Sequence, residues 1–399
     1  MSTANVRGRV TMAADAESCA DWVKRAAAEK AGMVITGAQR LEASLPGDEA
    51  RAVLSTAKLD RILEHEIQDL TLTCEAGCTL GTLARTVARA GQRLVIETPD
   101  PDAYTIGGII AGRVDGFIGG CYGSVRDQIL GIKVVLADGS ITKSGGRVVK
   151  NVTGYDLAKL YTGSRGALGV IVEVTLRLRA VAPGTRTFVL ERSNSDDALV
   201  LALRLRNLPG LVTGVAIAGG QAVAPGTGPW LVCVRVEGRR DTLADLARLV
   251  REAGGNAETL VGDDADGLWR ALADFPKRQA VEAELFVAPS KVAAAVRSMD
   301  KWGAPGRGFV VDVLSGRITA TLASTSGDLE AALSSLDIAN TARECDAFAS
   351  VPSDPLDWPR RAARFGARAT AEAALLKRLK AAFDPGSLFA DGRLAEEMA

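Results

Sequence analysis

The sequence has little histidine and few aromatic residues. Its 399 residues include one histidine, His65, and only 5% are Phe, Trp or Tyr. One imidazole cannot form the histidine cluster that many metal sites use, and we expect His65 to be an ordinary surface residue. We therefore predict no metal site.

A charge imbalance is also absent. The chain has 48 Lys and Arg residues and 48 Asp and Glu residues, so its formal net charge is zero. It has no run of like charges and no basic patch interleaved with aromatic residues. Nucleic acid is therefore not expected as a partner.

Long apolar runs are missing as well. The longest, such as residues 106–112 and 167–172, are far shorter than the roughly 20 residues that a transmembrane helix needs. The first residues contain no apolar stretch of signal-peptide length, and the six cysteines are scattered. Cys74 and Cys78 lack the spacing of a CxxC motif, so we expect them to be small buried residues. These features favour a cytoplasmic protein without a transmembrane segment.

The length predicts two domains, because single hydrophobic cores rarely grow beyond roughly 250–300 residues. In the first half, helical spacing predicts a helix over 16–30 and another that begins at Thr79 and stops at Gly91. Short β-like runs predict strands at 33–35, 52–54, 70–74, 129–137 and 167–178. Asp138-Gly139 is a strong hairpin signal after the fourth of these runs.

Residues 98–128 are dense in glycine, and we expect them to form a long irregular segment. Such segments are usually functional or disordered, and the apolar content of this one argues against disorder. We therefore expect it to bind a ligand.

The glycine-rich character stops near 181–186, which we take as the domain boundary. The second half alternates strand-like and helix-like runs, which predicts an α+β layer with its helices on one sheet face. The expected strands are 186–191, 212–217, 230–236, 284–287 and 308–313, and the expected helices are 196–207, 240–253, 266–273, 290–298 and 328–335. A last helix, at about 367–382, precedes the turn Asp384-Pro385-Gly386.

The glycines of the 98–128 segment allow two interpretations. Backbone N–H groups around Gly107-Gly108 could converge on a dinucleotide pyrophosphate, or the glycines could simply allow tight turns between packed strands. The chain has no GxGxxG between a strand and a helix and no phosphate-binding P-loop motif. Residues 163–169 are glycine-rich but lead into a strand, so backbone contact to a flat heterocycle is the better interpretation there.

Several motifs, taken in order, resemble the FAD domain of the vanillyl-alcohol oxidase and p-cresol methylhydroxylase (PCMH) family. They are the segments 105–111, 122–127, 130–139 and 163–175. Within this family, residues 145–156, Gly-Gly-Arg-Val-Val-Lys-Asn-Val-Thr-Gly-Tyr-Asp, are similar to the FAD-binding E subunit of bacterial glycolate oxidase. The resemblance covers roughly residues 30–180 and the tail at 383–394.

The resemblance implies an α+β fold with three parts. Residues 1–182 would form a PCMH-type FAD-binding domain of two subdomains, and 183–366 a ferredoxin-like α+β cap domain. Residues 367–399 would form a helix and tail that return to the FAD domain, with Asp391-Gly392-Arg393 directed towards the isoalloxazine ring.

The resemblance also implies a set of cofactor-binding residues. One group would cradle the pyrophosphate and wrap the diphosphate and ribityl chain: Thr36, Gly37, Ala38, Gln39, Arg40, Pro99, Asp100, Thr105, Ile106, Gly107 and Gly108. A second group would line or support the flavin pocket and contact the adenine: Gly112, Asp115, Gly123, Ser124, Asp127, Gly169, Ile171 and Val172. FAD would be bound non-covalently, because His65 is not at a matching position and Cys121 is expected to be buried.

Three functions follow as alternatives. The first is an FAD-carrying accessory subunit of a complex that oxidises glycolate or D-lactate. It would work beside a catalytic FAD-linked glycolate oxidase subunit and an iron–sulfur subunit, on the cytoplasmic face of the inner membrane. The second is a free-standing FAD-dependent 2-hydroxy acid dehydrogenase with Tyr104 or Tyr155 as base. The third is a scaffold without FAD, because Ala38-Gln39-Arg40 and Ala390-Asp391-Gly392 depart from the family pattern.

Overall fold

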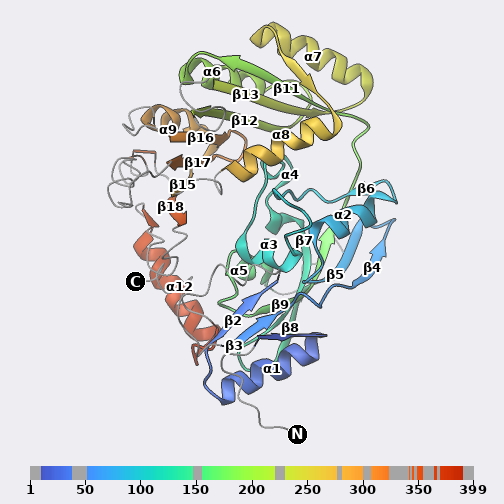
Figure 1. Cartoon of the computed structure of the whole chain (residues 1–399), viewed down its shortest axis with the longest axis vertical. Helices are drawn as coiled ribbons and strands as arrows, with labels where there is room; N and C mark the ends of the chain where they lie inside the picture. Colours follow the sequence, from blue (N-terminus) through green and yellow to red (C-terminus); the bar gives the residue numbers. More distant parts are fainter. Residues whose placement is uncertain are drawn as a thin grey trace. The chain divides into compact units, whose positions relative to one another are not determined.

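A computed structural model gives the structure of the chain. It describes residues 10–37, 52–146, 155–220, 230–275, 281–299, 307–322, 341, 344–345, 348–353, 364–365 and 369–389. These residues fall into two compact units (Figure 1). Unit 1 takes in the described parts of Met1–Asp115, Gly123–Val181 and Ala371–Ala399, and unit 2 those of Gly116–Tyr122 and Ala182–Thr370. The domain limits expected from the sequence stay predictions.

Unit 1 contains a small parallel layer. Strands β1 (Val10–Met12), β3 (Ala52–Ser55) and β2 (Met33–Thr36) pair in that spatial order. Helix α1 (Ala16–Ala28) begins at Asp15, whose carboxylate accepts from the backbone N–H of Ser18 at 2.7 Å. The buried face of α1 packs on the strands in one core with Met33 and Leu54. The helix–turn–strand prediction for residues 16–35 is confirmed.

A larger antiparallel layer completes unit 1. Its strands, in spatial order, are β4 (Ile62–Glu66), β5 (Thr71–Glu75), β9 (Val170–Arg177), β7 (Ile129–Val135) and β8 (Ile141–Gly145). Helices α2 (Leu80–Ala88) and α5 (Ala158–Tyr161) share its core, and β6 (Gln92–Arg93) pairs with β10 (Arg179–Ala180) beside it. The hairpin predicted at Asp138-Gly139 is confirmed, with Gly139 at φ +76° between β7 and β8.

The glycine-dense segment is more regular than expected. We predicted irregular structure throughout 98–128, but the structure has helix α3 (Ile106–Gly112), the short helix α4 (Gly119–Tyr122) and a 3₁₀ turn, η2 (Val125–Gln128). Helix α3 forms despite its glycines because Ile106, Ile109 and Ile110 recur at helical spacing and are fully buried. Tertiary burial overrides the low helix propensity of glycine here.

Unit 2 is built on a nine-stranded antiparallel sheet. Its strands, in spatial order, are β14 (Glu258–Leu260), β11 (Thr185–Arg192), β13 (Trp230–Glu237), β12 (Leu211–Gly220), β16 (Arg307–Asp312), β17 (Arg317–Leu322), β15 (Val281–Phe286), β18 (Phe348–Ser353) and β19 (Arg364–Phe365). Besides α4, its described helices are α6 (Ser195–Leu205), α7 (Arg240–Gly254), α8 (Gly262–Asp274) and α9 (Val292–Met299), with the 3₁₀ turn η4 (Pro289–Lys291) before the last.

The prediction that the helices lie on one sheet face is wrong. Helices α6, α7 and α9 share a core with Val215 and Ile217 of β12. Helix α8 instead packs with Ala216 and Ala218, which alternate with those residues along the same strand and therefore face the other side. Phe117, from the segment Gly116–Tyr122, joins this second core and lies edge-on to Trp269 of α8, with 5.0 Å between ring centroids. The helix expected at 328–335 lies outside the described residues.

The last described helix, α12 (Ala369–Phe383), leads into residues that contact unit 1 strands. The backbone N–H of Met33 donates to the carbonyl of Leu388 at 2.6 Å, and Phe389 pairs in parallel with Met33. Leu388 and Phe389 are buried in the core of α1 and β2. Residues 388 and 389 thus lie along the free side of β2.

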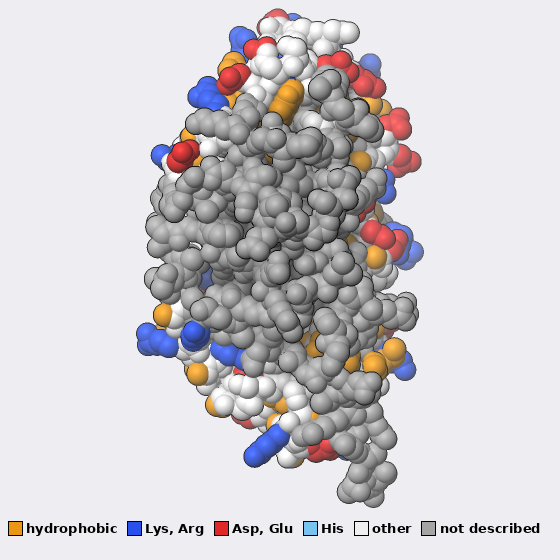
Figure 2. Space-filling model, turned by 60° about the vertical axis from the view of Figure 1, so that its left-hand side comes forward, with side chains coloured by type: hydrophobic (Ala, Val, Ile, Leu, Met, Phe, Trp, Pro, Cys, Tyr) orange, Lys and Arg blue, Asp and Glu red, His pale blue; other side chains and the backbone are white. Residues whose placement is uncertain are grey.

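The surface carries both signs of charge. On the face shown in Figure 2, the described Lys and Arg side chains and the described Asp and Glu side chains are both present. In the part of the chain that the structure describes, no helix has the length and apolarity to cross a bilayer.

A buried carboxyl group makes unit 2 sensitive to pH. Burial raises the pKa of Asp312 to about 6, although hydrogen bonds from Ser315 oppose the shift. The folded state therefore holds a proton that the unfolded state releases, and stability falls as pH rises from about 4 to about 6. Over this pH range, we expect the free energy of unfolding to fall by about 2 kcal/mol less in Asp312→Asn than in the unmodified protein. Urea unfolding of both proteins at several pH values measures it, and parallel stability curves would contradict the prediction.

Candidate cofactor-binding site

Two helices of unit 1 begin side by side. Thr79 caps α2 and Thr105 caps α3, and the two threonines form an antiparallel bridge. The N–H of Leu80 donates to the Tyr104 carbonyl at 2.9 Å, and the N–H of Ile106 donates to the Cys78 carbonyl at 2.8 Å. The N-termini of the two helices therefore meet at one place.

The first amides of α3 are already bonded within the protein. Gly107 N–H donates to the Ala76 carbonyl at 2.8 Å, and Gly108 N–H donates to Thr105 Oγ1 at 3.2 Å. These two amides do not form the anion nest that was one interpretation of the glycine run. The structure supports the other interpretation, in which the glycines allow close packing.

The close packing can be measured at three glycines. A Cβ on Gly107 would lie 2.8 Å from the Cβ of Ala76, and one on Gly37 would lie 2.1 Å from Thr105 Oγ1. A Cβ on Gly77 would lie 2.1 Å from the Thr56 carbonyl. No larger residue fits without movement of its neighbours. The end of β2, the turns near Thr56 and Gly77 and the start of α3 therefore converge on one small volume, which we call the glycine cradle.

The loop 163–169 closes the other end of α3. Gly163 N–H donates to the Ile110 carbonyl at 3.0 Å, and Arg165 N–H donates to the Ala111 carbonyl at 2.8 Å. Gly166, at φ +83°, approaches Ile35 of β2 so closely that a Cβ would lie 3.3 Å from Ile35 Cδ1. The loop therefore connects α3 to β2 before the chain enters β9.

The residues predicted to contact adenine lie at the start of β9. Gly169 has φ +155°, and a Cβ there would lie 2.6 Å from Val134 Cγ1. Ile171 and Val172 are buried in two different cores, and the Val172 carbonyl accepts from Ala76 N–H at 3.0 Å. Any contact of these two residues with adenine would therefore be made by backbone groups.

The segment before α3 contains one hydroxyl suited to a ligand. Thr98 Oγ1 is buried and has no hydrogen-bond partner among the described residues. Asp100, which we predicted as a diphosphate contact together with Pro99, instead uses its carboxylate to accept from Asp102 N–H at 3.2 Å and stabilise its own turn. A buried hydroxyl of this kind fits a bound polar ligand.

Asp115, Gly123, Ser124 and Asp127 form a separate group after α3. Asp115 accepts from Val125 N–H at 2.7 Å, and Asp127 accepts from the hydroxyl and the N–H of Ser124. Partial burial of Asp127 opposes its ionisation, but hydrogen bonds from Arg126 and Ser124 outweigh this and lower its pKa. Both carboxylates hold the backbone of this loop, and the roles predicted for them, lining the flavin for Asp115 and supporting its pocket for Asp127, stay predictions.

The structure thus brings Thr36 and Gly37 to Thr105–Gly108 and gathers Asp115 with Gly123–Asp127. Gly112 ends α3, beside Arg113 in the left-handed conformation. Ala38, Gln39, Arg40 and 391–393 lie outside the described residues. Sequence reasoning missed Thr56 and Gly77, although the turn Glu75-Ala76-Gly77 was a usable signal for the latter.

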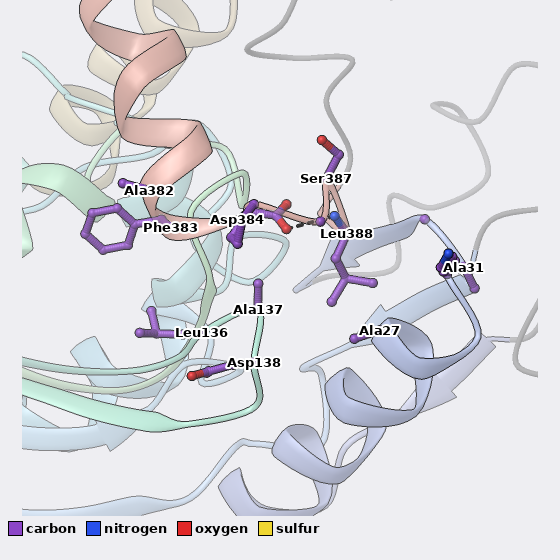
Figure 3. Close-up of a pocket in the computed structure, with 14 residues that line it drawn as sticks. Ala27, Ala31, Leu136, Ala137, Asp138, Ala382, Phe383, Asp384, Ser387 and Leu388 are labelled. Carbon is purple, nitrogen blue, oxygen red and sulfur yellow. Dashed lines mark hydrogen bonds between the residues drawn. The ribbon is translucent and has the colours of Figure 1, made fainter.

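A cavity of about 750 Å³ also occurs in unit 1, but it is not the glycine cradle (Figure 3). It is bounded by the end of α1, the turn after β7 and the residues after α12. Gly32, which lines it, lies before β2, whereas Gly37 of the cradle lies after β2. The two sites are therefore at opposite ends of this strand.

Other candidate residues have ordinary environments. Cys74 and Cys78 are buried, as expected, whereas Cys121 is only half-buried. His65 Nε2 lies 2.8 Å from Gln92 Oε1, so its ring has a protein partner. Tyr155 is 92% exposed, and Tyr104 is packed against the core of α2 and α3.

Comparison with known proteins gives a family match for part of the chain. Residues 9–145 match the family model described as "FAD binding domain". Residues 9–145 therefore resemble an FAD-binding domain, and this match supports FAD as the cofactor. The glycine cradle and the buried Thr98 hydroxyl are compatible with such a ligand.

The names of the relatives describe oxidases or dehydrogenases of 2-hydroxy acids. "Glycolate oxidase subunit GlcD" of Bacillus subtilis is 35% identical over 153 residues, which is 38% of this chain and 32% of that protein. "D-lactate dehydrogenase" of Archaeoglobus fulgidus is 39% identical over 126 residues, covering 32% of this chain and 28% of that protein. The matches thus span about a third or less of these relatives.

The fold has a counterpart among solved structures. A structure of alkyldihydroxyacetonephosphate synthase superposes with a TM-score of 0.67 over 95% of this chain and 75% of that one, at 14% identity. At this identity the likeness concerns the fold alone. The family resemblance stated from the sequence motifs is confirmed, and so is the mixed helix and sheet architecture.

Gly37 provides a test of the glycine cradle. We expect Gly37→Ala to destabilise the protein by about 1 kcal/mol and to weaken FAD binding, because the new methyl group displaces the hydroxyl that caps α3. In a chain that already carries Thr105→Ala, the same change should cost less, since the cap is already lost.

The control is Gly267→Ala in α8, where a Cβ meets nothing within 4 Å. The coupling is measured by unfolding curves and FAD titrations. These compare the unmodified protein, Gly37→Ala, Thr105→Ala and the double variant, with Gly267→Ala alongside. Additive effects of Gly37→Ala and Thr105→Ala would show that the two residues do not act on each other.

Proposed function

We propose that the protein is an FAD-binding accessory subunit of a complex that oxidises a 2-hydroxy acid such as glycolate or D-lactate. Two observations together carry this proposal. A family model for an FAD domain matches the chain, and the sequence similarity to the glycolate oxidase subunit covers only 38% of the chain. The family match lies within residues 9–145.

The chemistry of the second half supports an accessory role. Oxidation of a 2-hydroxy acid needs a base near the flavin and a cation or metal that fixes the carboxylate. FAD, when bound, supplies the electron acceptor. The chain's one histidine is on β4 of unit 1, so unit 2 offers no imidazole for either task. The guanidinium of Arg235 in unit 2 is buried over Trp269 and bonded to Thr213, which assigns it to packing.

The partners we propose are a catalytic FAD-linked glycolate oxidase subunit and an iron–sulfur subunit. The name of one relative, a glycolate oxidase subunit, supports assembly into a complex. In this proposal the protein is the counterpart of the E subunit, lies in the cytoplasm and reaches the inner membrane through its partners. Its flavin relays electrons or its fold organises the assembly.

A free-standing dehydrogenase is the second candidate, because several relatives are named dehydrogenases of D-lactate or D-2-hydroxyglutarate. Of the two tyrosines proposed as its base, Tyr104 is the better candidate. It belongs to the segment that pairs with α2 beside the glycine cradle, whereas Tyr155 is almost fully exposed.

Purification of the full chain with and without candidate partners separates these functions. We expect a yellow protein that releases FAD on acid precipitation and co-purifies with a second flavoprotein. Alone, it should not reduce an artificial acceptor with glycolate or D-lactate.

Other outcomes have different meanings. Turnover by the isolated chain would replace the accessory role with the free-standing dehydrogenase, and Tyr104→Phe would then be the variant to measure. A colourless chain whose thermal stability does not respond to added FAD would favour the scaffold alternative. Each result is read on the same preparation, so the three functions stay distinguishable.

A further inference from the structure

Unit 1 contains a buried ion pair that none of the predicted roles uses. Lys380 and Asp384 lie one helical turn apart at the end of α12, and Lys380 Nζ is 2.6 Å from Asp384 Oδ2. The Lys380 side chain is 7% exposed and the Asp384 side chain is fully buried. Placing two charges in a core is costly, and an apolar pair of similar volume often stabilises a fold as well or better. The contacts of this pair therefore call for a more specific role.

The ammonium group of Lys380 joins three segments of the chain. Besides Asp384, it donates to the Ala167 carbonyl and to the Phe389 carbonyl, each at 3.0 Å. These three oxygens match the three hydrogens of an ammonium group. Ala167 lies 213 residues from Lys380 in the sequence, so the contact is purely tertiary.

Asp384 fixes the chain that follows α12. Its carboxylate accepts from the N–H groups of Leu388 and Phe389, both at 2.8 Å, and Figure 3 shows Asp384 directed at Leu388. Leu388 in turn accepts from Met33 N–H at the start of β2. The turn at Asp384-Pro385-Gly386 is thereby held against the strand that ends at the glycine cradle.

Ala167 belongs to the loop 163–169, which has its own contacts to the cradle. Gly163 and Arg165 donate to the end of α3, and Gly166 lies against Ile35 of β2. Ala167 itself is buried, and Gly169 follows it with a left-handed φ at the entry to β9. A shift of the Ala167 carbonyl would therefore move a loop that has little freedom to adjust elsewhere.

We propose that Lys380 and Asp384 are positioning residues of the FAD site. Their contacts pre-organise the loop 163–169 and β2, so that the cofactor binds without first ordering these segments. The proposal rests on FAD as the cofactor of unit 1. It is independent of whether the protein is an accessory subunit or a dehydrogenase.

The test uses the full chain, with and without FAD. In Lys380→Met we expect FAD affinity to fall at least about tenfold, as expected when charge-assisted hydrogen bonds are lost. Amide hydrogen exchange in the FAD-free protein should become faster at Met33 and within 163–169. Faster exchange there shows that the pair orders these segments, and FAD affinity in a stable variant shows whether that order serves the cofactor.

Lys133→Met is the matched control. Lys133 is a partly buried lysine of unit 1 that pairs with Glu173 across strands β7 and β9. Its loss should lower stability while FAD affinity changes less than threefold, roughly the scatter of a partly exposed pair.

Because Lys380→Met leaves a buried carboxylate without its partner, Lys380→Met/Asp384→Asn is the second variant. It restores charge balance and should recover stability but not FAD affinity.

The outcomes decide the proposal. Unchanged FAD affinity in the stable double variant would overturn it. An equal loss of affinity in Lys133→Met would also overturn it, because general destabilisation would then explain the effect. If the unmodified chain binds no FAD at all, the cofactor assignment fails instead, and hydrogen exchange at 163–169 still reports whether the pair orders this loop.

Discussion

The contact on which unit 1 depends is the close approach of backbone segments around the start of α3. Gly37, Gly77 and Gly107 each lie where the Cβ of any other residue would collide with a neighbour. The bridge between Thr79 and Thr105 then sets two helices side by side. Because protein interiors are close-packed and adjust poorly to extra atoms, these contacts fix the spacing between β2, α2 and α3. That spacing sets how β2 of the parallel layer meets α2 and α3 at the candidate cofactor site.

Much of this arrangement was predictable from the sequence. Strands β2, β3, β5, β7 and β9 and the cap of α2 by Thr79 carry local signals, namely β-branched runs bounded by turns and a threonine before a periodic apolar run. The same holds for the hairpin at Asp138-Gly139. Strands β1, β4, β6, β8 and β10 were not predicted. The order of the glycine motifs pointed to an FAD domain even though no single motif did.

The errors have a common physical cause. Helix α3 was missed because three glycines lower helix propensity locally, whereas the burial of Ile106, Ile109 and Ile110 is decided by contacts distant in sequence. The position of α8 on the second sheet face was missed for a similar reason. Which face a helix covers depends on the alternation of residues such as Val215 and Ala216, and both are apolar. The partners of Lys380 were equally invisible, because Ala167 contributes only a carbonyl.

The segment Gly116–Tyr122 bears on how separable the two units are. It belongs to unit 2 through the burial of Phe117 and through the hydrogen bond from the Tyr122 hydroxyl to Glu237, yet unit 1 residues flank it on both sides. Unit 1 also needs the described residues after α12 for its core. A single cut near residue 181 would thus separate Phe117 from the unit 2 core that buries its ring. It would also remove Phe389 from the core of unit 1. The protein is modular in its architecture but not in its sequence, so neither unit can be separated or exchanged by a single cut of the chain.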